Sequence, residues 1–262
     1  MVGDTDEWLH PVDDDEPGWF DAMSFTAWDA PSRVLVHTRT AITPNAPDVR
    51  ATALWVTWID GQVHVRSTEL PDVPPHNWDV MEVGPVGYRM ERARERWTLH
   101  LADAGSEARA FLSFDGVSPC VGWSPGAYGQ RGRVSGDVQL GGRRIAFDGF
   151  GQRDHAWGPA DPGIVEAHRI DWFVDGVSGH VNHVLTDEGW LASGMSGDDP
   201  VASVERSTEV DAAGVPVRFT AVVSTANGPA VTLVGERSAA PIQSLVVMSL
   251  LGPDGVALYG TA

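Results

Sequence analysis

The sequence predicts an all-β protein made of two antiparallel β-barrels in tandem, and three observations support this fold class. Glycine and proline, 29 and 18 of the 262 residues, are spread evenly and separate short segments rich in Val, Thr, Trp and Phe. Several segments alternate apolar and polar residues with the period of two that is typical of strands. More than about ten such strands favour closed sheets, because large open antiparallel sheets curl or split.

The expected strands can be placed in chain order. Alternation begins at residues 32–39 and continues at 53–59, where Asp60-Gly61 leads into 62–66, and then at 96–101. Three further pairs follow: 131–139 with 143–148 around Gly141-Gly142, 165–174 with 179–185 around Asp175-Gly176, and 217–224 with 230–236. Asp-Gly and Gly-Gly supply the positive φ of tight hairpin turns. The best helical candidate, residues 83–96, is interrupted by Gly84-Pro85 and Gly87.

The midpoint of the chain predicts where the two barrels divide. Residues 116–130 are dense in Gly, Pro and Ser, which is typical of a connecting loop. We therefore expect an N-terminal barrel at residues 18–125 and a C-terminal barrel at 126–262. Residues 1–17 hold a run of acidic side chains that includes Glu7, and this composition predicts a solvated acidic arm.

Composition excludes several functional classes. The 36 acidic and 18 basic residues give a formal charge of -18, which disfavours a nucleic-acid partner. Every basic residue is Arg, so Schiff-base lysines and phosphate-loop lysines are excluded. The single cysteine, Cys120, excludes an internal disulfide. No apolar run approaches the roughly 18 residues of a membrane span, and the acidic start is unlike a signal peptide, so we expect a cytoplasmic protein.

The densest group of reactive side chains lies at residues 150–161, FGQRDHAWGPAD. In an extended strand Arg153, His155 and Trp157 face one way, whereas Asp154 faces the other. A carboxyl in an apolar cavity favours its neutral form and can deliver a proton, and imidazole titrates near neutrality. Asp154 and His155 are therefore candidate catalytic residues. The alternative is structural, with Arg153 forming a buried ion pair that supports the segment.

A second polar set follows on residues 165–174 and their hairpin partner. The candidate substrate-binding residues are Trp157, Trp172, His168, Asp171 and His180. Indole faces stabilise cations, so tryptophans around an acid suit an apolar substrate that develops positive charge. His180 and His183 are three apart and point oppositely on a strand, which argues against joint metal binding. A metal site built from His155, His168, Asp171 and one of His180 and His183 remains an alternative. We nevertheless expect no metal and no other cofactor, because no metal-binding spacing supports one.

The segment GRVSGDVQLGGRRIAFDGFGQRDHAWGPAD resembles the carotenoid 1,2-hydratases, or hydroxyneurosporene synthases, and their bacterial relatives. The resemblance covers residues 131–162 and extends more loosely to WFDAMSFTAWD at 19–29. It implies two tandem lipocalin-like barrels and strengthens a functional role for Asp154, His155 and Trp157. Ala156 stands where the family commonly has Ser. The family includes cofactor-independent enzymes that hydrate isoprenoid double bonds, and more distant two-barrel proteins catalyse Diels-Alder cyclisations of polyenes.

These observations lead to three hypotheses for a hydrophobic small-molecule substrate. The first is a metal-free cyclase or hydratase that protonates an alkene of a polyene or terpenoid, with Asp154 as the proton donor and His155 orienting it or taking the final proton. Trp157 and Trp172 would shield the cation, and Arg153 would be structural. The second is a pericyclase that folds its substrate without net proton transfer. The third is a non-catalytic carrier of apolar small molecules. Nothing in the sequence points to an oligomeric state.

Overall fold

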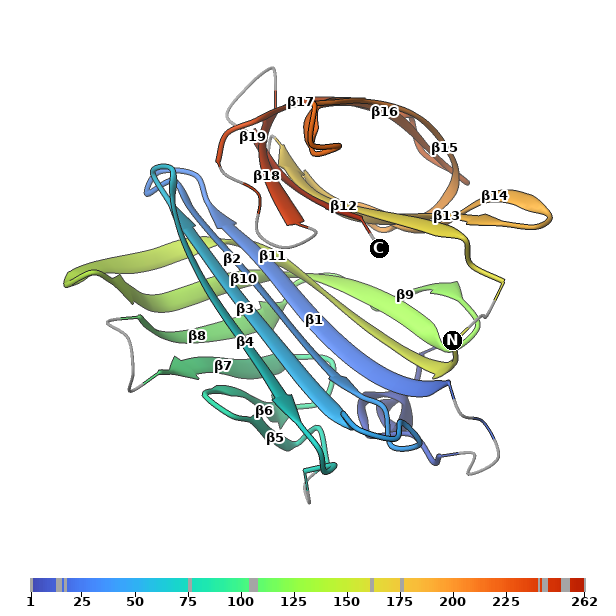
Figure 1. Cartoon of the computed structure of the whole chain (residues 1–262). Coiled ribbons are helices and arrows are strands. Elements are labelled where there is room, and N and C mark those ends of the chain that lie inside the picture. Colours follow the sequence, from blue (N-terminus) through green and yellow to red (C-terminus); the bar gives the residue numbers. More distant parts are fainter. Residues whose placement is uncertain are drawn as a thin grey trace. The chain divides into compact units, whose positions relative to one another are not determined.

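The computed structural model describes residues 2–12, 16, 18–74, 77–103, 108–160, 163–174, 177–239, 241, 245–250 and 255–261 (Figure 1). The chain forms two compact units, Met1–Pro162 and Gly163–Ala262. Each unit has its own apolar core, and each is an antiparallel β-structure.

The first unit is a curled sheet preceded by a short 3-10 helix, η1 (Asp4–Glu7). Its strands are β1 (Trp19–Asp29), β2 (Val34–Ile42), β3 (Ala51–Ile59), β4 (Gln62–Leu70), β5 (Val80–Val83), β6 (Val86–Arg92), β7 (Arg96–Ala102), β8 (Arg109–Gly116), β9 (Val121–Ser124), β10 (Ala127–Leu140) and β11 (Arg143–Pro159). The hydrogen-bonded order is β4-β3-β2-β1-β11-β10-β8-β7-β6-β5, with β9 beside β10. Because β1 and β11 lie at the centre of this order, the long strand β11 is paired on both edges.

Alternation along β1 places one set of side chains inside the curled sheet. Met23, Phe25 and Ala27 belong to the apolar core. The Phe25 ring lies 5.2 Å from Tyr88 and 5.5 Å from Phe114, in edge-on contacts that aromatic pairs favour. Ser24, between Met23 and Phe25, therefore faces outward from this core.

The second unit is a closed barrel of eight strands in the described part of the chain. The strands are β12 (Glu166–Val174), β13 (Val177–Thr186), β14 (Gly189–Ser196), β15 (Asp199–Val210), β16 (Pro216–Thr225), β17 (Val231–Arg237), β18 (Leu245–Leu250) and β19 (Gly255–Thr261). Neighbours in sequence are neighbours in the barrel, and β19 closes it against β12. Its core includes Ile170, Trp172, Phe219 and Tyr259.

The predicted fold class is confirmed: the protein is all-β, with two tandem barrel units, of which the first is open between β4 and β5 among the described residues. The Asp60-Gly61 and Gly141-Gly142 turns also form as predicted, and all four residues have positive φ. The Asp175-Gly176 turn lies outside the described residues. None of the described helices is long and apolar enough to cross a membrane.

Two sequence-based expectations about organisation differ from the structure. The units divide after Pro162, not after residue 125, because β10 and β11 pair with β8 and β1 of the first unit. Residues 116–130 are not simply a connecting loop, since they contain β9 and the start of β10.

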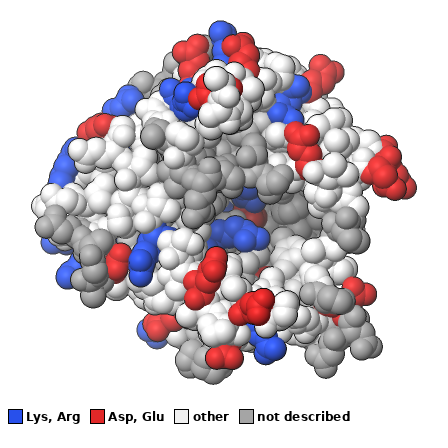
Figure 2. Space-filling view, in the orientation of Figure 1, with Lys and Arg blue, Asp and Glu red and all other residues white. Residues whose placement is uncertain are grey.

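The prediction of a solvated arm at residues 1–17 is wrong for Glu7, whereas Asp4 and Glu16 are exposed as predicted. Glu7 is fully buried in the first unit. Of the predicted acidic run, Asp13, Asp14 and Asp15 lie outside the described residues. Acidic and Arg side chains are interspersed over the face of the molecule that Figure 2 shows.

Candidate functional site

The RDHAW segment lies on β11, and strand alternation divides its side chains between two faces. Met23 and Ser24 of β1 are the register partners of His155 and Asp154. Because Met23 belongs to the core and Ser24 faces outward, His155 points inward and Asp154 outward. The predicted division of this segment is therefore observed, and it means that the structure does not bring the Asp154 and His155 side chains together.

The inward-facing His155 is enclosed in a polar network. Its Nε2 lies 2.7 Å from Oδ1 of Asp21, and its Nδ1 lies 3.3 Å from the Tyr128 hydroxyl. An ionised carboxylate only accepts hydrogen bonds, so Nε2 carries the proton in this pair. His155 is fully buried, and the Trp78 and Trp157 rings pack within 5.8 Å and 5.1 Å of its own.

Asp21 is saturated with hydrogen-bond donors. Oδ1 also accepts from Nε1 of Trp78 at 2.8 Å, and Oδ2 accepts from the backbone N–H and from Nδ1 of His10 at 2.9 and 3.1 Å. Burial alone would raise the pKa of Asp21, but the hydrogen bonds from His10 and His155 outweigh it and lower the pKa well below its ordinary value. Asp21 is therefore ionised at neutral pH, and its hydrogen bonds hold the carboxylate in place.

His10, Asp21 and His155 each offer a ligand atom within 4.8 Å of the others, and they are the candidate metal ligands of the first unit among its described residues. The arrangement of these side chains fits a hydrogen-bonded cluster better than a metal site. Both carboxylate oxygens already receive N–H donors, including the indole of Trp78 and the backbone of His10. We therefore assign this cluster to structure.

The other inward residues of the segment hold the N-terminal residues in place. Arg153 donates through both terminal nitrogens to the Glu7 carboxylate and through Nε to Oε1 of Gln130 at 2.9 Å. Both charged side chains are fully buried. Trp157 stacks on the His10 ring at 3.6 Å with an interplanar angle of 7°. The structural role of Arg153 stays a prediction, and Trp157 lies on the face opposite to Asp154.

The outward face of β11 carries the remaining candidate, Asp154. Oδ2 of Asp154 accepts a hydrogen bond from the Ser24 hydroxyl at 2.8 Å, and the residue as a whole is 6% exposed. One step along the same face of β1, the Thr26 hydroxyl lies 2.9 Å from Nδ1 of His37 on β2. This face therefore combines a buried acid with hydroxyl and imidazole groups that the interior network does not use.

The candidates of the second unit also separate by face. Trp172 is inside the barrel, in the core, and His168 lies on the same side of β12. Asp171 and His180 are register partners on the outer side of β12 and β13. Arg169 holds both carboxylate oxygens of Asp171, at 2.8 and 2.9 Å. His168 therefore does not share a site with Asp171 and His180 within this unit.

Sequence reasoning missed the partners of the segment. Glu7, Asp21, Ser24 and Tyr128 complete its hydrogen bonds, and in the second unit Tyr259 contacts His168. The partners on β1 and η1 are more than a hundred residues away along the chain, so no local motif includes them. The loose resemblance of residues 19–29 to a known family was the one available signal for Asp21 and Ser24.

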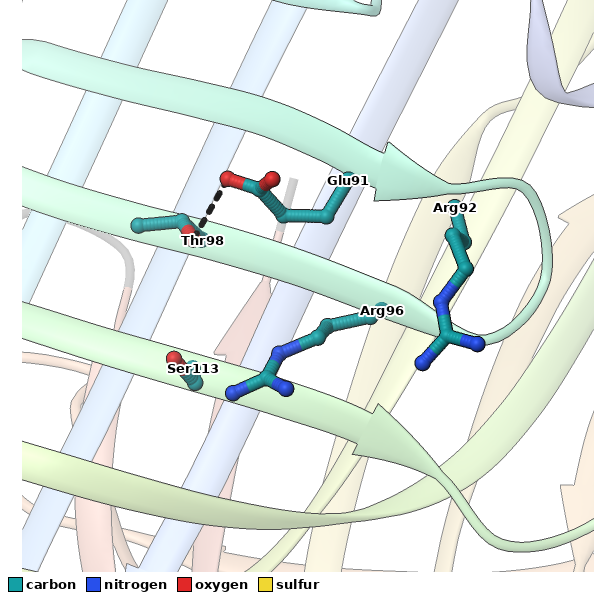
Figure 3. Close-up of a pocket in the computed structure, with 5 residues that line it drawn as sticks. All are labelled: Glu91, Arg92, Arg96, Thr98 and Ser113. Atoms are coloured by element: carbon teal, nitrogen blue, oxygen red, sulfur yellow. Dashed lines mark hydrogen bonds between the residues drawn. The ribbon is translucent and has the colours of Figure 1, made fainter.

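Three surface pockets of the first unit lie elsewhere, and the smallest, of about 390 Å³, includes Leu101 and Phe111. One of about 450 Å³ sits on the outer side of β6, β7 and β8 and is lined by Glu91, Arg92, Arg96, Thr98 and Ser113 (Figure 3). Its charged lining does not suit the apolar substrate predicted above. A third pocket of about 560 Å³ includes Cys120. Burial raises the pKa of the Cys120 thiol, so this cysteine is a poor nucleophile at neutral pH.

Comparisons with known proteins agree with this architecture. Residues 3–255 match the model of a family described as a domain of unknown function, DUF7064. No curated protein matches the chain. Three similar solved structures are a protein of Nitrosomonas europaea provisionally named AttH, CghA in complex with Sch210972, and kievitone hydratase of Nectria haematococca.

The three structures resemble this chain over nearly its whole length. The Nitrosomonas protein has a TM-score of 0.64 at 12% identity, and 92% of each chain is covered. CghA has a TM-score of 0.63 at 13% identity, with 94% of this chain and 88% of its own covered. Kievitone hydratase has a TM-score of 0.62 at 10% identity, with 97% and 92% covered. The tandem lipocalin-like fold implied by the RDHAWG segment is thereby confirmed.

Proposed function

We propose that this chain, which belongs to the DUF7064 family, is a cofactor-independent enzyme that protonates an alkene of a hydrophobic polyene or terpenoid. Cyclisation, hydration or isomerisation of the resulting cation completes the reaction, and Asp154 is the proton donor. The observation that carries the proposal is the position of Asp154: a buried carboxyl on the outward face of β11, separated from the saturated network around Asp21. The similarity to a hydratase of the same fold supports an enzymatic role.

Ser24 has a defined part in this mechanism. When the Asp154 carboxyl transfers its proton to an alkene carbon, the acid becomes a carboxylate and the substrate a carbocation. The Ser24 hydroxyl donates to Oδ2 of Asp154, and this hydrogen bond strengthens as negative charge develops. A base then removes a proton from the cation, or a water molecule adds to the cation and loses a proton, and the released proton restores the Asp154 carboxyl. His155 is not assigned that role, because its ring faces the interior, where Nε2 bonds Asp21 and Nδ1 faces the Tyr128 hydroxyl.

The test uses linear isoprenoids and polyene chains in heavy water, with products analysed by mass spectrometry. The wild type is compared with Asp154→Asn and Ser24→Ala. Asp148→Asn is the matched control, since Asp148 lies on the same strand with its side chain 73% exposed. We expect a product that carries one deuterium, its loss in Asp154→Asn, and a rate about tenfold lower in Ser24→Ala, the effect of one charge-assisted hydrogen bond.

Other outcomes identify the alternatives. An unlabelled isomer formed equally by the wild type and Asp154→Asn would replace this proposal with a pericyclase, in which pocket shape folds the substrate for cycloaddition. Tight binding of an apolar chain without any product would favour a carrier. Circular dichroism of each variant shows that a lost product is not caused by a lost fold.

A further inference from the structure

The closed barrel of the second unit has a weak seam between β14 and β15. Among the described residues these strands pair only at Met195 with Pro200 and at Ser196 with Asp199. They then separate, as Figure 1 shows where β14 diverges from β15 at the right. The strand pairs on either side of this seam are longer: β13 and β14 share eight residue pairs, and β15 pairs with β16 from Val201 to Val210 with two register shifts. At one end of the barrel, β14 and β15 therefore share no sheet hydrogen bonds among the described residues.

Six side chains converge on the barrel interior at this end. Ile170, Ala192, Val204 and Tyr259 contact the apolar core, which fixes the inward side of each strand. By alternation the inward residues nearest this end are Glu166, His168, His183, Trp190, Arg206 and Tyr259. Their contacts agree: the Arg206 guanidinium lies 5.4 Å from the Trp190 ring across the seam, and the His183 ring lies 4.4 Å from it.

Part of this group forms a chain of hydrogen bonds from Glu166 through His168 and Tyr259 to Arg206. His168 contacts Glu166 through Nε2 and the Tyr259 hydroxyl through Nδ1 at 2.9 Å. Arg206 donates to the same hydroxyl at 2.6 Å. Burial lowers the pKa of His168 and raises that of Tyr259, so both are neutral at pH 7. The one full positive charge here, on Arg206, faces Glu166 at 3.9 Å.

Two polar atoms of the group remain without a hydrogen-bond partner. Nε of Arg206 and Nδ1 of His183 are both buried and unpaired among the described residues. His183 as a whole is 7% exposed, and burial and the nearby Arg206 lower its pKa, which keeps the ring neutral. Both atoms belong to side chains packed on Trp190, a residue that is 44% exposed. A buried donor without an acceptor is costly and points to a missing partner.

We propose that this end of the second barrel binds a planar aromatic compound that carries a neutral carbonyl oxygen. The aromatic body stacks on the Trp190 indole, and the carbonyl oxygen accepts from Nε–H of Arg206 and from His183. Arg206 always keeps its protons, so the ligand group must be an acceptor. Glu166 already compensates the Arg206 charge, and the chain carries a formal charge of -18, so a neutral acceptor is preferred to a carboxylate.

The experiment uses three probes of the same shape: 2-acetylnaphthalene, 2-naphthoate and 2-ethylnaphthalene. Their binding to the full chain is measured by calorimetry and by the indole N–H resonance of Trp190, identified by its absence in Trp190→Ala. The variants are Trp190→Ala and His183→Phe, which keeps a ring on the indole but removes the nitrogen atoms. Trp8→Ala is the control, since Trp8 is similarly exposed, at 39%, in the first unit.

We expect saturable binding of 2-acetylnaphthalene with one site per chain. Affinity should fall about three- to tenfold in His183→Phe, the effect of one hydrogen bond, fall further in Trp190→Ala, and stay unchanged in Trp8→Ala. Absence of binding, equal affinity for all three probes, or unchanged affinity in both Trp190→Ala and His183→Phe overturns the proposal. Because the readout is affinity and not turnover, this result is independent of the role proposed for Asp154.

Discussion

The consecutive residues Asp154 and His155 serve different purposes because a strand turns adjacent side chains to opposite faces. His155 is held by Asp21 and Tyr128 in the interior, whereas Asp154 is held by Ser24 outside it. Substituting His155 should therefore act mainly on the fold of the first unit, and substituting Asp154 mainly on chemistry. This separation explains how one short segment carries both a structural network and a candidate acid.

The buried pair of Glu7 and Arg153 gives the first stability prediction. Glu7→Gln removes one charge and leaves the Arg153 guanidinium buried without its counter-charge. We expect a loss of about 3–5 kcal/mol in the free energy of unfolding. Urea denaturation followed by tryptophan fluorescence measures it, because nine of the eleven tryptophans lie in the first unit. Asp4→Asn, which breaks an exposed pair with Arg94, is the control and should have a much smaller effect.

The lowered pKa of Asp21 gives a pH-dependent prediction. An unfolded aspartate titrates near about 3.9, and the folded pKa lies below that, so ionised Asp21 stabilises the fold at neutral pH. We expect Asp21→Asn to cost about 1.5–3 kcal/mol at pH 7, the range for hydrogen bonds to a charged group. The difference from the wild type should shrink as the pH falls below about 4. A difference that stays constant from pH 7 to pH 3 would contradict this assignment.

At the residue scale, the sequence predicted how the side chains of the RDHAW segment divide between two faces, but not which residues they contact. The division of the RDHAW side chains between two faces follows from the alternation of side chains along any strand. Asp21, Glu7 and Ser24 lie 134, 146 and 130 residues from the side chains they bind. Such pairs depend on the register of β1 against β11 and on the path of the N-terminal residues, and no local pattern encodes either.

At the scale of elements, the sequence predicted turns whose own residues determine the turn. It missed a strand that forms only because a neighbouring strand pairs with it. Gly141-Gly142 formed the expected turn between β10 and β11. The Gly- and Pro-rich residues 116–130 contain β9 because the ladder of β10 offers it an edge. Composition alone therefore cannot distinguish a loop from a short strand that a neighbour stabilises.

Gly126, in the turn between β9 and β10, gives a prediction for this element. Its φ is +70°, and a Cβ there would lie 2.4 Å from the backbone oxygen of Trp157 on β11. Gly141 has a similar φ of +56° but open space around it. Gly126→Ala should therefore destabilise the first unit by more than Gly141→Ala, whose cost is the backbone strain of about 1 kcal/mol. Thermal unfolding of both variants tests this order, and equal losses would show that β11 yields to the added methyl.

At the scale of the whole molecule, division of the chain into halves of similar length predicted a boundary after residue 125. The strand pairing instead places the boundary after Pro162. The β10 and β11 strands complete the first sheet by pairing with β8 and β1, so the first unit is longer than the second. Equal division by length fails because β1, at the start of the first unit, finds its partner at the end of that unit. A contact of this kind is fixed by long-range pairing and not by composition.

The boundary has a direct test in fragments of the chain. A fragment of residues 1–162 retains the complete first core, whereas one of residues 1–125 lacks Val134, Val138, Ile145 and Phe147 of that core and exposes the edge of β1. We expect the longer fragment to give a dispersed amide NMR spectrum and a cooperative thermal transition. The shorter fragment should give neither, because it also loses Arg153, the partner of buried Glu7. Cooperative folding of residues 1–125 alone would instead place the division where the sequence predicted it, and would make β10 and β11 an addition to a barrel already stable without them.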